Sequence, residues 1–142
     1  MNDILKVSNL NTEFKSDYGS KQALKNITFN IKDGEVLALV GESGSGKTVT
    51  SLSIMGLLPN NASVQEGEIK LIDKNNNEIN VLNLSDKQHN DIRGNDISMV
   101  FQEPMTCLNP TMTVGEQILE VIVRHKKISK SKARMEVIDL LN

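Results

Sequence analysis

The chain has 142 residues, the length of about one ordinary domain, which excludes two complete catalytic domains. Apolar residues make up 38% and charged residues 24%, which is typical of a globular fold and excludes a disordered or fibrous chain. The formal net charge of -2 excludes the basic footprint of a general nucleic-acid-binding domain, so we expect no nucleic-acid partner.

Three further features narrow the class of protein. No basic segment followed by a long apolar run opens the chain, and no run approaches the roughly 18 apolar residues that span a bilayer, so we expect neither an ordinary secretion signal nor a membrane-spanning helix. The single cysteine, Cys107, indicates a reducing compartment. The basic excess of residues 124–142 is typical of a solvated face between two helices.

The first half of the chain predicts strands followed by a helix. Alternation of Ile27, Phe29 and Ile31 with polar residues predicts a strand with one solvent-exposed face, within a β-rich stretch over residues 1–34. Residues 35–40 form an unbroken apolar run after a turn signal, which predicts a buried, parallel strand. Apolar residues at helical spacing predict a helix over residues 47–58.

The second half predicts shorter elements. We expect strands over residues 69–72 and 79–82, a short helix that Ser85 caps, and a strand over residues 97–101. Two helices should follow, one from about Val114 and one that Ser129 caps. The sequence stops inside the second helical pattern without Gly or Pro, which suggests a truncated chain.

Residues 41–48 match the phosphate-binding loop pattern GxxxxGK followed by Ser or Thr. Glycines in such a loop allow backbone torsions closed to other residues, so that successive N–H groups and the following helix N-terminus face one anion. Lys47 is then expected to reach the β- and γ-phosphates of ATP, and the Thr48 hydroxyl to bind Mg²⁺. The expected nucleotide-binding residues around this loop are Gly41, Glu42, Ser43, Gly44, Ser45, Gly46, Lys47, Thr48 and Val49.

Several motifs around the loop point to one family. Tyr18 precedes Gly41 by 23 residues, and Gln102 stands in the stretch 99–104 that follows a predicted strand. The stretches 105–110 and 113–118 come next, with Cys107 where Ser is usual. With these motifs the whole chain resembles the ATP-binding subunit of an ABC transporter, within the oligopeptide and dipeptide importers.

The resemblance implies roles for three residues. Tyr18 would stack on the adenine ring, with Phe14 as the alternative, because stacking needs only a free aromatic face. In the family, the stretch that contains Gln102 is called the Q-loop. Gln102 and Lys47 would both be catalytic residues, and Gln102 and Thr48 would both be Mg²⁺ ligands. An uncharged amide suits that position because it can both donate and accept hydrogen bonds.

The resemblance also implies what the chain lacks. The signature motif, the second acidic motif (Walker B) and the switch histidine lie downstream of the Q-loop in the family and are not found in this sequence. His89 and His125 are expected to be surface residues.

We therefore expect an α/β fold of the P-loop NTPase (ABC ATPase) type, with an N-terminal antiparallel β subdomain, truncated before those motifs. The expected parts are a β-rich leader (1–34), the core through the Q-loop (35–104) and the start of a helical subdomain (105–142). Such a chain should hydrolyse ATP negligibly by itself and should leave unpaired strand edges.

The implied function is coupling of ATP binding and hydrolysis to peptide import, at the cytoplasmic face of the cell membrane. The implied partners are two transmembrane permease subunits, a second ATP-binding subunit and, indirectly, an extracellular substrate-binding protein. Close relatives of this subfamily import nickel and other small solutes. The alternative is an ABC-type clamp or interaction module without a transport role. A small-molecule kinase is disfavoured because forty residues precede the phosphate loop.

Overall fold

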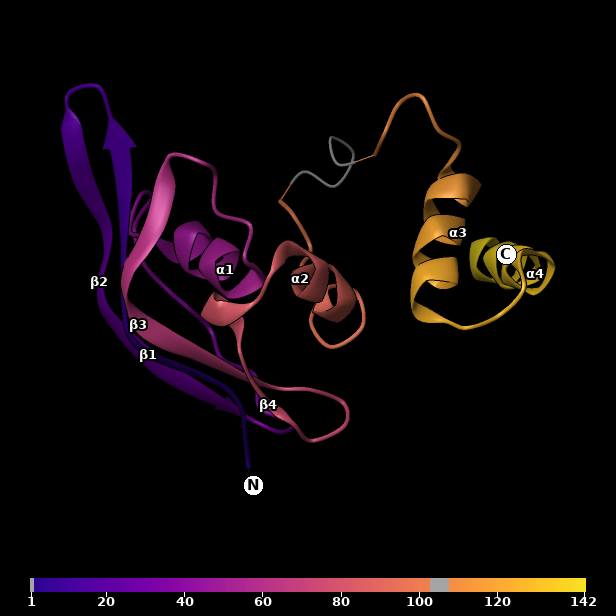
Figure 1. Ribbon diagram of the computed structural model, residues 1–142, viewed down its shortest axis with the longest axis horizontal. Helices are drawn as coiled ribbons and strands as arrows, with labels where there is room; N and C mark the ends of the chain where they lie inside the picture. Colours follow the sequence, from indigo (N-terminus) through magenta and orange to yellow (C-terminus); the bar gives the residue numbers. More distant parts are fainter. Residues whose placement is uncertain (1, 103–107) are drawn as a thin grey trace. The chain divides into compact units, whose positions relative to one another are not determined.

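The computed structural model describes residues 2–102 and 108–142, which divide into two compact units, Met1–Ile92 and Arg93–Asn142 (Figure 1). The first unit carries the β-sheet and the phosphate loop, and the described part of the second carries two helices. The finer division at residues 34 and 104 stays a prediction. None of the described helices is long and apolar enough to cross a membrane.

The first unit is built on a four-stranded antiparallel sheet. Its strands are β1 (Asp3–Ser16), β2 (Gly19–Lys32), β3 (Ala62–Ile72) and β4 (Glu78–Asn80), in the order β2-β1-β3-β4. This sheet confirms the expected antiparallel β subdomain. The strands expected over residues 69–72 and 79–82 are present in part, because β3 begins earlier and residues Val81–Asn83 form a short 3-10 helix, η1.

The core of this unit lies on one face of β1 and β3. Leu5, Val7 and Leu10 of β1 and Ile69 and Leu71 of β3 are buried, and burying such side chains stabilises the fold by about 1.5–3 kcal/mol each. The change from odd to even positions between Val7 and Leu10 requires a register shift, which the structure places there. α1 (Lys47–Met55) lies beside β3 (Figure 1), and its Ile54 and Met55 add to the buried set.

Asparagines stabilise the irregular part of β1. Asn9 has a φ of 48° and Asn26 a φ of 52°, in the left-handed region that Asn tolerates better than most residues. The buried Asn11 side chain donates to the Asn9 carbonyl (2.7 Å) and to Asn26 Oδ1 (3.1 Å), and its Oδ1 accepts from the Asn26 main-chain N–H (3.0 Å). These bonds satisfy polar groups that the register shift removes from the ladder.

Two helices of the first unit have recognisable caps. Gly56, with a φ of 61°, closes α1 by donating its N–H to the carbonyls of Leu52 and Ser53. α2 (Asp86–Ile92) follows Ser85, whose hydroxyl accepts from the Gln88 N–H at 3.5 Å, as the sequence predicts.

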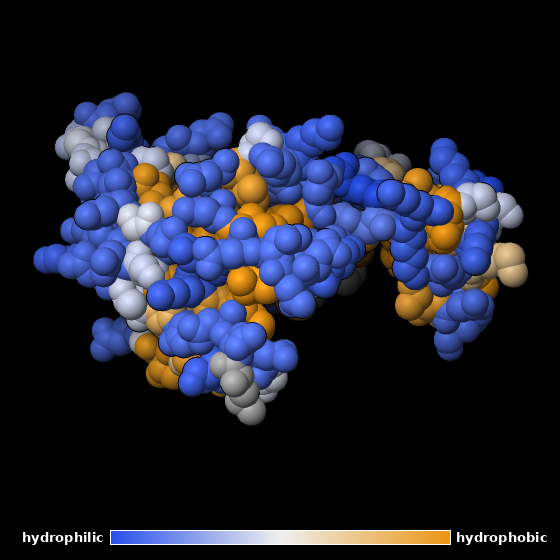
Figure 2. Space-filling model, turned by 60° about the horizontal axis from the view of Figure 1, so that its bottom comes forward, coloured by the Kyte–Doolittle hydropathy of each residue, from blue (hydrophilic) through white to orange (hydrophobic). Residues whose placement is uncertain are grey.

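The second unit contains α3 (Val114–His125) and α4 (Lys130–Leu141), and both helix predictions are confirmed. Thr113 and Glu116 form a capping box before α3, and Ser129 caps α4. Among the described residues of this unit, the buried side chains are Ile122 of α3 with Ala133 and Val137 of α4, surrounded by half-buried aliphatic residues. Figure 2 shows further apolar side chains at the surface of the molecule.

Two strand predictions are wrong. Residues 35–40 and 98–101 carry no strand, and Val36 is 95% and Val100 90% exposed. A parallel strand needs a neighbour to supply ladder partners and a cover for its faces. No described strand pairs with either segment, and only an isolated bridge joins Arg93 to Ile97. Residues 35–40 are therefore exposed and lie outside the sheet.

The two histidines also differ from the prediction. Both are half-buried instead of lying free on the surface. The His89 ring packs against Gly56, where an added Cβ would come within 2.6 Å of Nδ1, and His125 lies near Gly94, with Nε2 3.5 Å from such a position. Each imidazole therefore fills space beside a glycine within its own unit.

Candidate functional site

The phosphate loop leads directly into α1, as its sequence predicts. Gly44 and Gly46 have φ values of 81° and 93°, in the region that only glycine adopts without strain. The N–H of Ser45 donates to the Glu42 carbonyl at 3.2 Å, which closes a turn inside the loop. The loop residues from Gly41 to Ser45 are exposed, so a ligand can reach their main-chain amides.

Gly46 is held against the sheet by close packing. A Cβ at this position would lie 2.5 Å from Leu24 Cδ2 and 3.1 Å from the Ala23 carbonyl oxygen, both on β2. Leu24 is itself buried, so it cannot move aside freely. The sequence does not indicate Leu24 as a supporting residue, because an apolar residue in a strand gives no signal about which loop it will contact.

Lys47 folds back over the loop. Its Nζ donates to the carbonyl oxygens of Gly41 and Glu42, both at 2.7 Å, and to Ser45 Oγ at 3.2 Å. These acceptors are oxygens that phosphate oxygens can replace as partners of an ammonium group. The positive charge of Lys47 therefore lies next to the main chain of the loop.

The N-terminus of α1 provides the other half of an anion site. Its N-cap, Gly46, has no side chain to cap the helix, and no acidic side chain lies in its first turn. The first N–H groups of a helix have no partner within the helix, and the helix dipole places partial positive charge there. Together with Lys47 these groups suit the phosphates of a nucleotide.

Thr48 is exposed in the first turn of α1, where its hydroxyl can serve as a metal ligand. Within residues 2–102 and 108–142, no group of three His, Cys, Asp or Glu side chains could hold a metal ion. Mg²⁺ commonly binds through one or two protein oxygens together with phosphate oxygens and water, and does not need a cage of acidic side chains. The donor set around Thr48 fits this mode of binding.

Tyr18 lies at the turn between β1 and β2 and is 100% exposed, so both faces of its ring are open. The strand β2 that follows this turn carries Leu24, which lies against Gly46, and the six residue steps from Tyr18 to Leu24 extend at most about 20 Å. Phe14 is half-buried within β1, between Lys21 of β2 and Ala62 of β3. Tyr18 is therefore the better placed of the two for stacking.

Gln102 belongs to the second unit and is exposed. The stretch that follows it, residues 103–107 with Cys107, lies outside the described residues. The part of the expected site that this structure brings together is the phosphate loop with β2 and the hairpin that carries Tyr18. The role of Gln102 stays a prediction.

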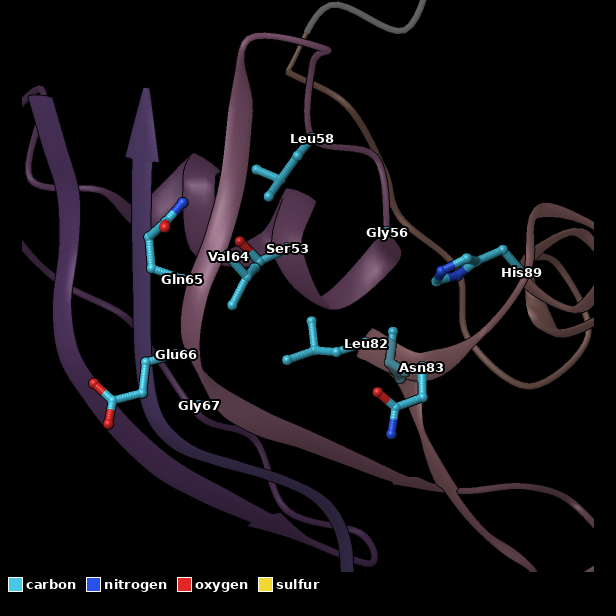
Figure 3. A pocket seen from close by; sticks show the side chains of 11 residues that line it. Ser53, Gly56, Leu58, Val64, Gln65, Glu66, Gly67, Leu82, Asn83 and His89 are labelled. Carbon is cyan, nitrogen blue, oxygen red and sulfur yellow. The ribbon is translucent and has the colours of Figure 1, made fainter. Parts of the chain in front are cut away.

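A separate cavity of about 460 Å³ opens between α1, β3 and η1. Figure 3 shows Leu58 and Leu82 pointing into it, His89 pointing toward Gly56, and Glu66 pointing away. Gly56 ends α1, whereas Gly46 begins it, so about 15 Å of helix separates this cavity from the phosphate loop. The cavity is therefore not part of the nucleotide site.

The loop, the uncapped helix and the antiparallel sheet define a nucleotide-binding protein of the P-loop type. A family model described as "ABC transporter" matches residues 24–142, and the chain belongs to this family. Its fold is that of an ABC ATPase with an N-terminal antiparallel β subdomain. The solved structure of the ATP-binding cassette MJ0796, a dimer in a post-hydrolysis state bound to ADP and Pi, is 27% identical with a TM-score of 0.73, and the match covers 95% of this chain and 54% of that one.

Among curated relatives, the chain is similar to dipeptide and oligopeptide transport ATP-binding proteins. It is 50% identical to the dipeptide transport ATP-binding protein DppD of Bacillus subtilis (strain 168), over 100% of this chain and 41% of the relative. It is 46% identical to the oligopeptide transport ATP-binding protein AppD of the same organism, over 99% of this chain and 42% of that protein. The chain thus spans about two fifths of the length of these relatives.

Proposed function

We propose that the chain is the nucleotide-binding part of a subunit that couples ATP binding and hydrolysis to the import of peptides. The observation that carries this proposal is the position of Lys47 Nζ, 2.7 Å from two loop carbonyls at the uncapped start of α1. Peptide as the cargo rests on the names of DppD and AppD, and nickel or another small solute is the alternative cargo.

Different residues of the site are expected to bind the phosphates, the metal ion and the adenine ring. Main-chain amides from Gly41 to Val49 hold the phosphates, and Lys47 exchanges its loop carbonyls for phosphate oxygens. Thr48 and Gln102 would hold Mg²⁺, which would neutralise charge on the phosphates, and Tyr18 would stack on the adenine ring. Phosphoryl transfer depends mainly on positioning and on charge stabilisation, so these contacts set the rate of hydrolysis in the complete site.

The partners are those of an importer. A second ATP-binding subunit faces the first, in line with the dimeric state of the MJ0796 cassette, and two permease subunits anchor the pair at the cytoplasmic face of the membrane. An extracellular binding protein supplies the cargo. A clamp without a transport role is less favoured, because the relatives are transport proteins. Co-purification with integral membrane proteins separates the two functions.

Nucleotide binding by the 142-residue chain tests the site. Lys47→Ala removes a charged partner of the phosphates, worth about 1.5–3 kcal/mol, so the affinity for a fluorescent ATP analogue should fall about 10- to 100-fold. Lys87→Ala, which removes an exposed lysine of α2, is the matched control and should leave the affinity unchanged. Equal affinities of all three chains would contradict the assignment. Hydrolysis by this chain alone should be negligible.

Peptide uptake tests the function. In a complete importer that contains this subunit, Lys47→Ala should abolish ATP-dependent uptake of a labelled dipeptide, and Lys87→Ala should not. Uptake that persists in the Lys47→Ala transporter would overturn the coupling role. Uptake of nickel in place of dipeptide would keep the coupling role and change the cargo.

A further inference from the structure

The phosphate loop packs against β2 at the point where α1 begins. A Cβ added at Gly46, the N-cap of α1, would lie 2.5 Å from Leu24 Cδ2 and 3.1 Å from the Ala23 carbonyl oxygen. Leu24 is 2% exposed, and closely packed side chains pass small displacements to their neighbours. The position of Leu24 therefore helps to set the conformation of the loop at Gly46.

The strand β2 is irregular on both sides of Leu24. Thr12 of β1 pairs with Leu24, and in each direction from this pair β2 takes one more residue than β1 to reach the next pair. Asn26 lies in one of these irregularities, with a φ of 52°. Extra residues of this kind bend a strand and re-aim the side chains beside them. The direction of the Leu24 side chain therefore depends on how residues 22–26 are held.

The Asn11 side chain bridges the two ends of this irregular stretch. Its Oδ1 accepts hydrogen bonds from the main-chain N–H of Asn26 (3.0 Å) and from Nε2 of Gln22 (3.2 Å). Its Nδ2 donates to Asn26 Oδ1 (3.1 Å) and to the Asn9 carbonyl (2.7 Å). Asn11 is buried, so its hydrogen bonds are stronger than they would be in water. One side chain therefore holds β2 on both sides of Leu24.

We propose that Asn11 is a positioning residue of the nucleotide site, which holds residues 22–26 so that Leu24 sets the conformation of the phosphate loop at Gly46. This inference rests on the proposed nucleotide-binding function and adds to it a residue of β1, outside the loop. Without the Asn11 bonds the stretch is less restricted, so the loop has its binding conformation for a smaller fraction of the time. The apparent affinity for nucleotide falls by that fraction.

Titration with a fluorescent ATP analogue tests this role. Asn11→Ala removes the four hydrogen bonds of the side chain. The affinity should fall about 3- to 10-fold, as expected when the loop is competent in about a third to a tenth of the molecules. Circular dichroism at the temperature of the titration ensures that only folded chains are compared.

Thr28→Val is the matched control for a loss of strand stability. The Thr28 hydroxyl accepts from the Asn9 main-chain N–H at 2.9 Å and donates to Asn9 Oδ1 at 3.3 Å, in the same irregular part of the β1 and β2 pair. Thr28 follows Asn26 in the chain and lies outside residues 22–26. Thr28→Val should therefore lower stability and leave the affinity for nucleotide unchanged.

Asn11→Asp separates positioning from stability. Its carboxylate still accepts from the Asn26 N–H and from Gln22 Nε2, on both sides of Leu24, but has no donor for the Asn9 carbonyl. The variant should lose stability and yet bind nucleotide more tightly than Asn11→Ala does. A residue that served stability alone would instead give affinities that follow the stabilities of the variants.

Amide hydrogen exchange gives a second measurement that needs no nucleotide. The Thr50 N–H donates to the Gly46 carbonyl at 2.8 Å, in the first turn of α1. Asn11→Ala should speed exchange of this amide severalfold, because Gly46 is no longer held in one position. Thr28→Val should leave the rate as it is in the parent chain.

Three results would overturn the inference: parent affinity in Asn11→Ala, an equal loss in Thr28→Val, and an Asn11→Asp chain that binds as weakly as Asn11→Ala. Failure of the proposed function looks different, because Lys47→Ala would then bind the analogue as the parent chain does. In that case the exchange of Thr50 still decides whether Asn11 positions the loop. Equal rates in Asn11→Ala and the parent would overturn that role.

Discussion

Two glycines of the phosphate loop have the same kind of backbone conformation but different surroundings. Gly44 and Gly46 both have positive φ, at 81° and 93°. Nothing lies within 4 Å of a Cβ added at Gly44, whereas one at Gly46 would overlap Leu24. The two positions therefore separate the cost of a strained backbone from the cost of lost space.

Alanine at each position should show this difference in the free energy of unfolding. Gly44→Ala should lower it by about 1–2 kcal/mol, the cost of a left-handed conformation for a residue with a Cβ. Gly46→Ala adds an overpacking cost of about 1–3 kcal/mol, for a total of about 2–5 kcal/mol. Urea denaturation of the two variants measures both values. Equal losses would show that the contact with Leu24 imposes no cost.

At the scale of single residues, the sequence predicts the phosphate-loop residues well. It predicts poorly the residues that pack against the loop. The pattern of residues 41–48 identifies Lys47 and the glycines because each has a local role within the loop. Leu24 lies 22 residues before Gly46, and its contact depends on how β2 packs against α1. Such contacts are set by tertiary packing, which no local pattern specifies.

The secondary-structure elements with local signals are predicted best. The sequence predicts the start of α3 at about Val114 and the Ser129 cap of α4, and a cap is a local signal because it bonds to main-chain groups only a few residues away. Residues 35–40 have an equally clear apolar pattern, yet they form no strand. A strand depends on a partner that lies elsewhere in the sequence, so its pattern is a necessary condition and not a sufficient one.

The capping box of α3 makes the stability of this helix depend on pH. The main-chain N–H of Thr113 (3.1 Å) and then its hydroxyl (2.9 Å) donate to the Glu116 carboxylate and hold the pKa of that carboxyl below its usual value of 4.5. A lowered pKa in the folded state means that the stabilisation is present above pH 4.5 and is lost as the pH falls through the folded-state value.

Glu116→Gln should remove this dependence. The amide still accepts a hydrogen bond but carries no charge, so the variant should be less stable at neutral pH and should approach the parent chain in acid. The measurement is the urea midpoint of the helical circular dichroism signal at neutral pH and well below pH 4.5. Glu120→Gln, one turn further along α3, is the control and should follow the parent chain. A constant difference between Glu116→Gln and the parent at all pH values would contradict the assignment.

At the scale of the whole molecule, the two units differ in how much core they contain. The first unit buries aliphatic side chains from β1, β2, β3 and α1, whereas the second buries Ile122, Ala133 and Val137. Buried apolar area is the main source of stability, so the α3 and α4 pair should open at a lower free energy than the sheet.

Hydrogen exchange of two matched variants tests whether the units open separately. Val7 of β1 and Val137 of α4 are both buried, and replacing either by Ala removes the same groups at a cost of about 2–3 kcal/mol. Val137→Ala should speed amide exchange in α3 and α4 and leave β1 and β3 protected, because the lost contact belongs to the second core alone. Val7→Ala should speed exchange in the sheet by a similar factor. If either substitution accelerated exchange equally in the strands and in both helices, the two units would have to unfold as one cooperative body, and the packing of each core would not set its own stability.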